Sequence, residues 1–129
     1  MKLLVDTHAL IWWWMDGTRL PEKARAAISD GETSVWVSVA SVWEIAIKHG
    51  LGKLELHPKI LAGLRSGDAL KTFDELPITR RHVVEAGALP HYHGDPFDRL
   101  LIAQAKLEGL TLVSNEKLFD RYGVPRQWD

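Results

Sequence analysis

Short apolar runs alternate with amphipathic stretches along the chain, as they do where strands alternate with helices. The run Lys2–Val5 is ended by Asp6, which is typical of a strand buried on both faces. Further strands are predicted at Ser34–Val37, Thr72–Leu76, Leu110–Ser114 and Val124–Gln127. Helices are predicted between them, at His8–Met15, Pro21–Ile28, Val39–His49, Pro58–Leu64, Thr79–Ala86 and Pro96–Glu108, with a helical turn at Lys117–Tyr122.

Proline and glycine mark several of the predicted helix ends. Pro21 stands at a first helical position, where its missing N–H costs nothing. The strongest helix pattern opens with Asp95 as N-cap and Pro96 as first residue, and it stops at Gly109.

Strands that alternate with helices predict an α/β fold, in which a central and mostly parallel sheet is covered by helices on both sides. In such folds ligands bind outside the carboxyl ends of the strands, near a topological switch point. The residues that directly follow each strand are therefore the first candidates for a functional site.

Composition narrows the class of protein. The chain has 129 residues, 46% of them hydrophobic, and we expect one domain over residues 1–129. It has no cysteine, which excludes a disulfide scaffold, a thiolate zinc finger and a cysteine nucleophile. The 16 Lys and Arg against 17 Asp and Glu give a formal net charge of −1, which excludes a polybasic tail.

The apolar N-terminal stretch Met1–Met15 resembles a targeting segment only at first sight. Asp6, Thr7 and His8 interrupt it, and the remaining run Ala9–Met15 is far shorter than the ~20 residues that cross a bilayer. We therefore expect a buried strand that runs into a helix, no membrane segment and a cytoplasmic location.

Asp6 and Glu44 each follow a predicted strand, and each has a structural explanation beside a functional one. Asp6 suits an N-cap of the helix that follows it. Glu44 forms a capping-box pattern with Ser41 and an i,i+4 ion-pair pattern with Lys48. The helix around Glu44 is largely apolar, however, and a carboxylate in such surroundings is costly unless it is paired or binds a metal. Both explanations stay open for each residue.

Asp98 and Glu116 extend the set of acids. Asp98 precedes Leu101, Ile102 and Ala105 at helical spacing, so it heads the apolar stripe that faces the sheet. The polar residues Gln104, Lys106 and Glu108 are expected on the solvent side, and Asp95 is explained as a cap. Glu116 closely follows the strand Leu110–Ser114.

Together, Asp6, Glu44, Asp98 and Glu116 would gather at one edge of a parallel sheet. Carboxylates at close range repel one another, so some stay protonated unless a cation neutralises them. All-oxygen ligation suits Mg²⁺ or Mn²⁺ rather than zinc. Such a site performs metal-assisted phosphoryl chemistry, in which the metal activates water and offsets charge on the phosphate.

The chain resembles the PIN-domain ribonucleases, and among them the VapC-type toxins of bacterial toxin–antitoxin pairs. The matching segments are Leu3-Leu4-Val5-Asp6-Thr7-His8-Ala9-Leu10, Ser38-Val39-Ala40-Ser41-Val42-Trp43-Glu44-Ile45, His93-Gly94-Asp95-Pro96-Phe97-Asp98-Arg99-Leu100-Leu101-Ile102-Ala103-Gln104-Ala105 and Leu112-Val113-Ser114-Asn115-Glu116. The resemblance covers nearly the whole chain. It implies a PIN-like three-layer α/β/α domain that cleaves RNA with Mg²⁺ or Mn²⁺.

The resemblance also assigns roles to the acids. Asp6 and Asp98 would be metal ligands, and Glu44 the acid that orients the attacking water or holds metal through water. Glu116 stands where family members usually have Asp, and its longer side chain would reach metal through water. A supporting role by hydrogen bonding follows for Ser114 and Thr7, and Asp95 and Arg99 are further supporting candidates.

Partners follow from the same resemblance. VapC-type toxins are usually homodimers, and a small antitoxin protein blocks their active site. We therefore expect an RNA substrate, a cognate antitoxin and a homodimer.

Several other residues are ambiguous. His91 and His93 are weak evidence for zinc, and a loop role or a contact with substrate is the alternative. Lys48, Lys53 and Arg99 are either RNA-backbone contacts or solvated surface charges. The consecutive tryptophans Trp12, Trp13 and Trp14 cannot all face one core, so we expect at least one to meet a partner or to lie under another segment.

Other functions were weighed against a toxin nuclease. A PIN nuclease of RNA processing, or one that acts on DNA, would need the same acids. A signalling receiver domain has adjacent acids after its first strand and a Lys after its last, whereas Thr7 and His8 follow Asp6 here. His8 also excludes an Asp-x-Asp phosphatase. A catalytically weak, partner-binding PIN domain is favoured only by Glu116.

Overall fold

A five-stranded parallel sheet forms the centre of the computed structural model, which describes residues 2–129. The strands are β1 (Lys2–Val5), β2 (Ser34–Ser38), β3 (Asp74–Leu76), β4 (Thr111–Val113) and β5 (Arg126–Gln127). Their order across the sheet is β3-β2-β1-β4-β5, and all neighbours are parallel. The chain moves outward from β1 in both directions, so the topological switch point lies between β1 and β4. The predicted α/β fold with a mostly parallel sheet is confirmed.

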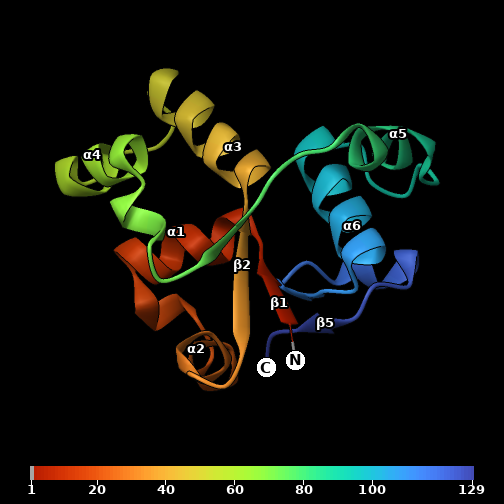
Figure 1. Ribbon diagram of the computed structural model, residues 1–129, viewed down its shortest axis with the longest axis horizontal. Helices are drawn as coiled ribbons and strands as arrows, with labels where there is room; N and C mark the ends of the chain where they lie inside the picture. The colour runs from red at the N-terminus through yellow and green to blue at the C-terminus, as the bar shows by residue number, and fades with distance from the viewer. Residues whose placement is uncertain (1) are drawn as a thin grey trace.

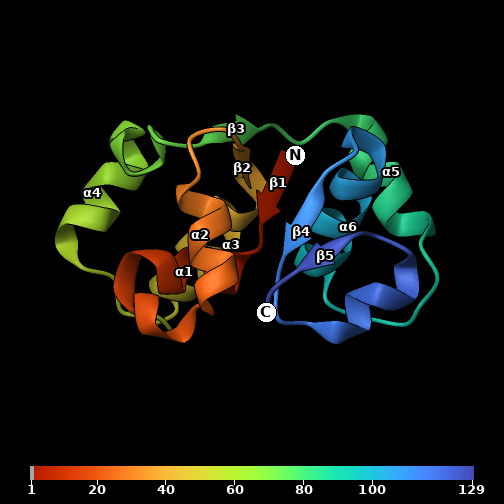
Figure 2. The same ribbon diagram turned by 90° about the horizontal axis from the view of Figure 1, so that it is seen from below.

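Helices cover both faces of the sheet (Figures 1 and 2). One layer holds α1 (Thr7–Met15), α2 (Glu22–Ser29), α3 (Val39–Gly50) and α4 (Pro58–Ser66), and the other holds α5 (Arg80–Ala88) and α6 (Pro96–Glu108). Three short 3₁₀ turns, η1 (Gly17–Arg19), η2 (Asp68–Leu70) and η3 (Lys117–Tyr122), complete the chain. None of the helices described between residues 2 and 129 has the length and apolar character that a membrane span requires.

Alternation along β1 divides the core into two halves. Leu3 and Val5 are fully buried against the first helical layer, which holds α1 to α4. Leu4 is fully buried in the other half, with Leu101 and Ile102 of α6. A strand buried on both faces must be apolar at every position, which explains the unbroken run that predicted it.

Most predicted elements form within a few residues of their predicted ends, and α6 has the predicted bounds. Pro21 is the N-cap of α2 and not its first helical residue, because its ψ of 155° is extended. Thr79 likewise caps α5 from outside the helix, through a hydrogen bond that its hydroxyl accepts from the His82 amide. β3 begins two residues later than the predicted strand Thr72–Leu76.

The prediction that Gln104 faces solvent is wrong. Its side chain is fully buried, and its Oε1 accepts a hydrogen bond of 2.6 Å from the Ser38 hydroxyl. Its Nε2 lies 3.3 Å from the Pro77 carbonyl and 3.3 Å from Nδ1 of the buried His82. The His82 ring in turn pairs with Glu108 at 2.9 Å. This polar chain joins the end of β2 to α5 and α6.

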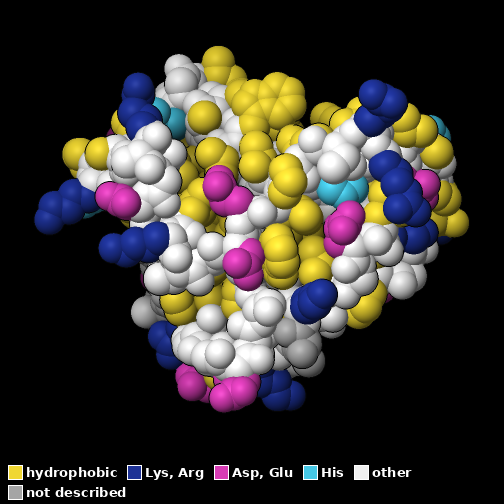
Figure 3. Space-filling model, viewed as in Figure 1, with side chains coloured by type: hydrophobic (Ala, Val, Ile, Leu, Met, Phe, Trp, Pro, Cys, Tyr) yellow, Lys and Arg dark blue, Asp and Glu magenta, His cyan; other side chains and the backbone are white. Residues whose placement is uncertain are grey.

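The tryptophans are used in two ways. Trp12, Trp13 and Trp14 all pack partly buried against the same core, so the expectation that they cannot all face one core is wrong. The Trp12 ring also lies 5.8 Å from that of Trp128, so one of them does meet another segment, as expected. Trp43 on α3 is 58% exposed. Figure 3 shows hydrophobic side chains reaching the surface between α3 and α6.

Replacing Gln104 with Leu should test the buried polar chain. The variant leaves the Ser38 hydroxyl without its acceptor and the Pro77 carbonyl without its donor. We expect the free energy of unfolding to fall by about 1–3 kcal/mol in urea titrations. Lys106→Leu on the exposed side of the same helix is the matched control and should change it by less than about 0.5 kcal/mol. Equal effects of the two substitutions would contradict this account.

Candidate active site

Asp6 lies at the switch point, directly after β1. Its amide donates to the Val113 carbonyl of β4, and its Oδ1 accepts a hydrogen bond of 2.8 Å from the Ala9 amide, so the predicted N-cap is confirmed. The side chain is almost fully buried, and this burial raises its pKa, against a hydrogen bond from Ser114 that lowers it. Capping uses one carboxylate oxygen and does not exclude a second role.

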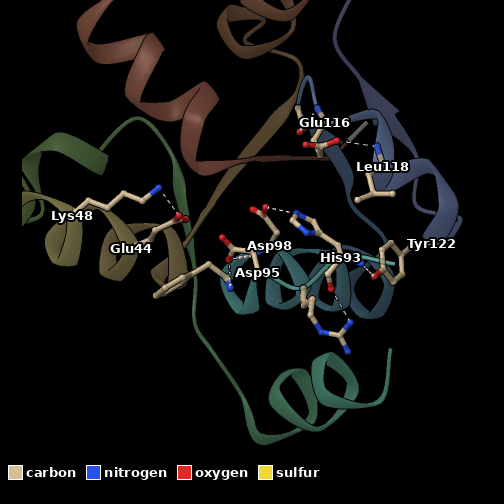
Figure 4. Close-up of polar contacts among 11 residues, drawn as sticks. Glu44, Lys48, His93, Asp95, Asp98, Glu116, Leu118 and Tyr122 are labelled. Carbon is tan, nitrogen blue, oxygen red and sulfur yellow. Dashed lines mark hydrogen bonds and ion pairs between the residues drawn. The ribbon is translucent and has the colours of Figure 1, made fainter. Parts of the chain in front are cut away.

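Glu44 is also buried, in α3, but it takes no part in a capping box. The helix begins at Val39, and Ser38 is the N-cap, with its hydroxyl 3.0 Å from the Ala40 amide. Ser41 instead accepts a hydrogen bond from Thr7. The predicted ion pair is present, with 2.9 Å between Lys48 Nζ and Glu44 Oε2 (Figure 4).

The second oxygen of Glu44 is the unusual one. Oε1 is buried and has no hydrogen-bond partner among residues 2–129. An unpaired carboxylate oxygen in a low-dielectric site is costly, so a group that binds it from outside the chain is the natural partner.

Asp98 projects from the first turn of α6 between Glu44 and His93 (Figure 4). Burial, and then the charge of Asp95, raise its pKa to about 6, while the hydrogen bond from His93 lowers it. Glu44 adds a smaller repulsive contribution to the pKa of both Asp98 and Asp6. Glu44 therefore acts electrostatically on both Asp6 and Asp98, whereas the sequence predicted a group of four acids that also contained Glu116. Asp95 caps the helix through the Phe97 and Asp98 amides, also as predicted.

His93 was not singled out as a partner of Asp98, yet its Nε2 lies 2.7 Å from Asp98 Oδ2. Its amide donates to the Tyr122 hydroxyl, and its ring stands 5.9 Å from that of Phe119. Only its place in the loop before Asp95 hinted at a position near the site. Among the described residues, His91 and His93 form no group with a third zinc ligand.

Arg99 lies next to Asp98, but its side chain is bound within the chain. Its guanidinium is buried and donates to five backbone carbonyls, those of Ala86, Gly87, Leu89, Pro90 and His93. Both readings of Arg99, as an RNA contact and as a solvated charge, are therefore wrong. Arg99 supports the site by shaping the loop that carries His93.

The remaining predicted site residues are Glu116, Ser114 and Thr7. Glu116 is exposed, and its Oε1 accepts from the Leu118 amide as the cap of η3 (Figure 4). Ser114 accepts a hydrogen bond from the Glu116 amide, and its contact with Asp6 lowers the pKa of that acid, as a supporting role of Ser114 would require. Thr7 does not bond an acid, because its hydroxyl is committed to Ser41.

A polar pocket of about 270 Å³ joins several of these groups. Asp6, Asp98 and Glu116 line it, together with four other residues: His8, Trp12, Asn115 and Phe119. Within residues 2–129, no three His, Asp or Glu side chains are close enough together to form a complete metal site. The chemistry of the donors still fits a hard cation, since Asp6, Asp98 and Glu116 offer carboxylate oxygens to the pocket, and Glu44 Oε1, which does not line it, has no hydrogen-bond partner in the described part of the chain.

Comparisons with known proteins identify the family model that this chain matches and its relatives. Residues 3–125 match the family described as PIN domain. Ribonuclease VapC22 of Mycobacterium tuberculosis (strain ATCC 25618 / H37Rv) is 29% identical over 126 residues, which are 96% of this chain and 94% of the relative.

Solved structures show the same fold at low identity. VapBC2 from Rickettsia felis, bound to a DNA fragment from its promoter, aligns over 100% of both chains with a TM-score of 0.74 and 16% identity. DNA-bound VapBC from Salmonella typhimurium aligns over 98% of this chain and 97% of that chain, with a TM-score of 0.73 and 19% identity.

The shifted pKa of Asp98 predicts how stability depends on pH. Between the model-peptide value of 3.8 and about 6, the folded protein holds a proton that the unfolded chain has lost, so stability from this group falls as the pH rises through that window. Without metal, Asp98→Asn should therefore raise the free energy of unfolding above pH 6 by on the order of 1–3 kcal/mol, with little effect below pH 4. Urea titrations across pH measure this, with exposed Asp74→Asn as control. A pH-independent difference would contradict it.

Proposed function

This chain belongs to the PIN domain family, and on that premise we propose that it is a metal-dependent endoribonuclease that hydrolyses RNA phosphodiester bonds as the toxin of a toxin–antitoxin pair. Residues 1–129 would act as one nuclease domain, and we place it in the cytoplasm. The observation that carries the proposal is the polar pocket at the switch point of the sheet, which Asp6 and Asp98 line and whose two acids both feel the charge of Glu44.

The proposed roles follow from the surroundings of each acid. Mg²⁺ or Mn²⁺, when bound, would activate a water molecule and offset the charge that develops on the phosphate. Asp6 and Asp98 would hold the ion, because both line the polar pocket and both have a raised pKa without it. Glu44 Oε1 has no partner in the described chain and would orient the attacking water. Cleavage would leave a 5′-phosphate and a 3′-hydroxyl.

The observations support a role for Glu116 less strongly than they support roles for the other acids. It lines the pocket, yet it is exposed and one oxygen already caps η3. We therefore assign it to contact the metal through water, as its greater length relative to Asp also suggests.

Replacing the acids one at a time tests the reaction directly. Purified protein is incubated with a mixed pool of end-labelled RNAs and Mn²⁺, Mg²⁺ or EDTA. We expect metal-dependent cleavage by wild type and none by Asp98→Asn or Glu44→Gln. Glu44→Gln should keep or raise the melting temperature, because it removes a buried charge. Exposed Glu22→Gln on α2 is the matched control and should cleave normally.

Melting curves supply a second readout, independent of cleavage. Millimolar Mn²⁺ should raise the melting temperature of wild type by mass action and leave that of Asp98→Asn unchanged. A wild-type curve indifferent to Mn²⁺, together with absent cleavage, would overturn the proposal and leave a partner-binding domain.

The antitoxin is the proposed protein partner. The structural relatives include VapBC complexes, and the curated relative is named a VapC ribonuclease. An RNA-processing PIN nuclease would use the same acids, so co-purification with a small protein that suppresses cleavage would distinguish the toxin from it.

The proposed homodimer has a candidate surface between α3, α5 and α6. An almost wholly apolar cavity of about 520 Å³ lies there, lined by Ile47, Val83, Phe97 and Leu100 beside the exposed Trp43. Trp43 packs edge-on against Phe97, with 5.2 Å between ring centroids. Trp43 is thus part of the wall of an exposed apolar cavity, and an apolar surface of this kind suits the core of a homodimer interface.

Light scattering on a size-exclusion column tests this surface. Trp43→Glu should lower the measured mass from dimer to monomer, because it places a charge in the apolar interface. Met15→Ser, which removes another exposed apolar side chain on α1, should leave the mass unchanged. A monomeric wild type would contradict the dimer.

A further inference from the structure

Another cavity, of about 330 Å³ and here called the second cavity, adjoins the acid-lined pocket, but its charged side chains include cations as well as acids. It lies beside α1 and the end of α3, and His8 and Trp12 line both cavities. A strand that passes through the acid-lined pocket would therefore reach this cavity without leaving the surface.

Three cations line the second cavity: Arg19, Lys48 and Lys53. The Arg19 guanidinium is held 5.2 Å above the Trp12 ring, a cation–π contact that fixes its position. Within residues 2–129, neither Arg19 nor Lys53 has a carboxylate oxygen within 4 Å. Lys48, by contrast, is paired with Glu44 at 2.9 Å (Figure 4).

Two carboxylates also line the cavity, those of Asp16 and Glu55. Asp16 is engaged locally, because it accepts a hydrogen bond from the Thr18 hydroxyl. Neither acid pairs with Arg19 or Lys53, so the two cations keep their donors for an outside group.

We propose that Arg19 and Lys53, with Lys48, form a binding subsite for a backbone phosphate of the RNA strand that flanks the scissile bond. The proposal rests on the nuclease function above and deepens it. Carboxylates at the reaction centre repel the phosphates on either side of the cleaved one, and cations in the adjoining cavity offset that repulsion.

Trp12 positions Arg19 in this subsite and does not stack on a base. Its ring is approached by the Arg19 guanidinium, by Trp128 at 5.8 Å and by His8 at 5.9 Å. These neighbours occupy the indole, so the ligand chemistry is that of an anion bound by guanidinium and ammonium groups.

Fluorescence anisotropy with a labelled single-stranded RNA tests the subsite. The Asp98→Asn protein serves as background, so that binding is measured without cleavage. Adding Arg19→Ala or Lys53→Ala should weaken binding about fivefold each and reduce the slope of log affinity against log salt by about 0.7 per lost phosphate contact. Arg19→Lys should restore most of the affinity.

Arg80→Ala is the matched control, since Arg80 is exposed on α5, at the opposite end of the molecule from α1 (Figures 1 and 2). It should bind RNA as the background protein does. Unchanged melting temperatures in all variants exclude a folding defect.

Two results would overturn the subsite: RNA binding by Arg19→Ala and Lys53→Ala that equals that of Arg80→Ala, or no RNA binding by the background protein. If RNA binds through these cations but wild type cleaves none with Mn²⁺, the nuclease function fails and the subsite stands. If wild type cleaves while the cations have no effect, the subsite alone fails.

Discussion

Burial of acids that lie close to one another is the constraint on which the structure around the switch point depends. Asp6, Glu44 and Asp98 come from three different elements. Burial is the first cause that raises the pKa of Asp6 and of Asp98, and the charge of Glu44 adds a smaller rise to both. Because burial also removes the screening that water provides, the fold must hold each carboxylate in place by specific bonds.

Each acid is held in its own way. Asp6 is fixed by the Ala9 amide and Ser114, Glu44 by Lys48, and Asp98 by His93. Every one of these contacts uses only part of the carboxylate's capacity to accept. The acids are thereby oriented while oxygens such as Glu44 Oε1 keep their capacity for an outside partner. The burial and repulsion that raise the pKa of Asp6 and Asp98 are the same interactions that would favour a bound cation.

Sequence reasoning predicted the features that depend on neighbouring residues and missed those that depend on distant ones. The unbroken apolar run of β1 and the Asp95-Pro96 start of α6 are local signals, and both led to correct elements. Helical spacing shows which side of a helix is apolar, and it therefore predicts that Gln104 faces solvent. It does not show that Ser38 would supply a buried hydrogen-bond partner. Arg99 was misread for the same reason, because its acceptors are carbonyls of a loop whose path no periodicity describes.

The hydrogen bonds of Arg99 also affect how the activities of variants of this chain should be interpreted. One guanidinium holds five carbonyls that fan out around the loop before α6, and an ammonium, with three donors on a single atom, cannot span them. The loop carries His93, and Asp98 follows it directly. Even a Lys in place of Arg99 would therefore displace these two residues of the reaction centre. A screen for inactive variants would therefore identify Arg99 together with the acids, although Arg99 acts only by holding the loop in place.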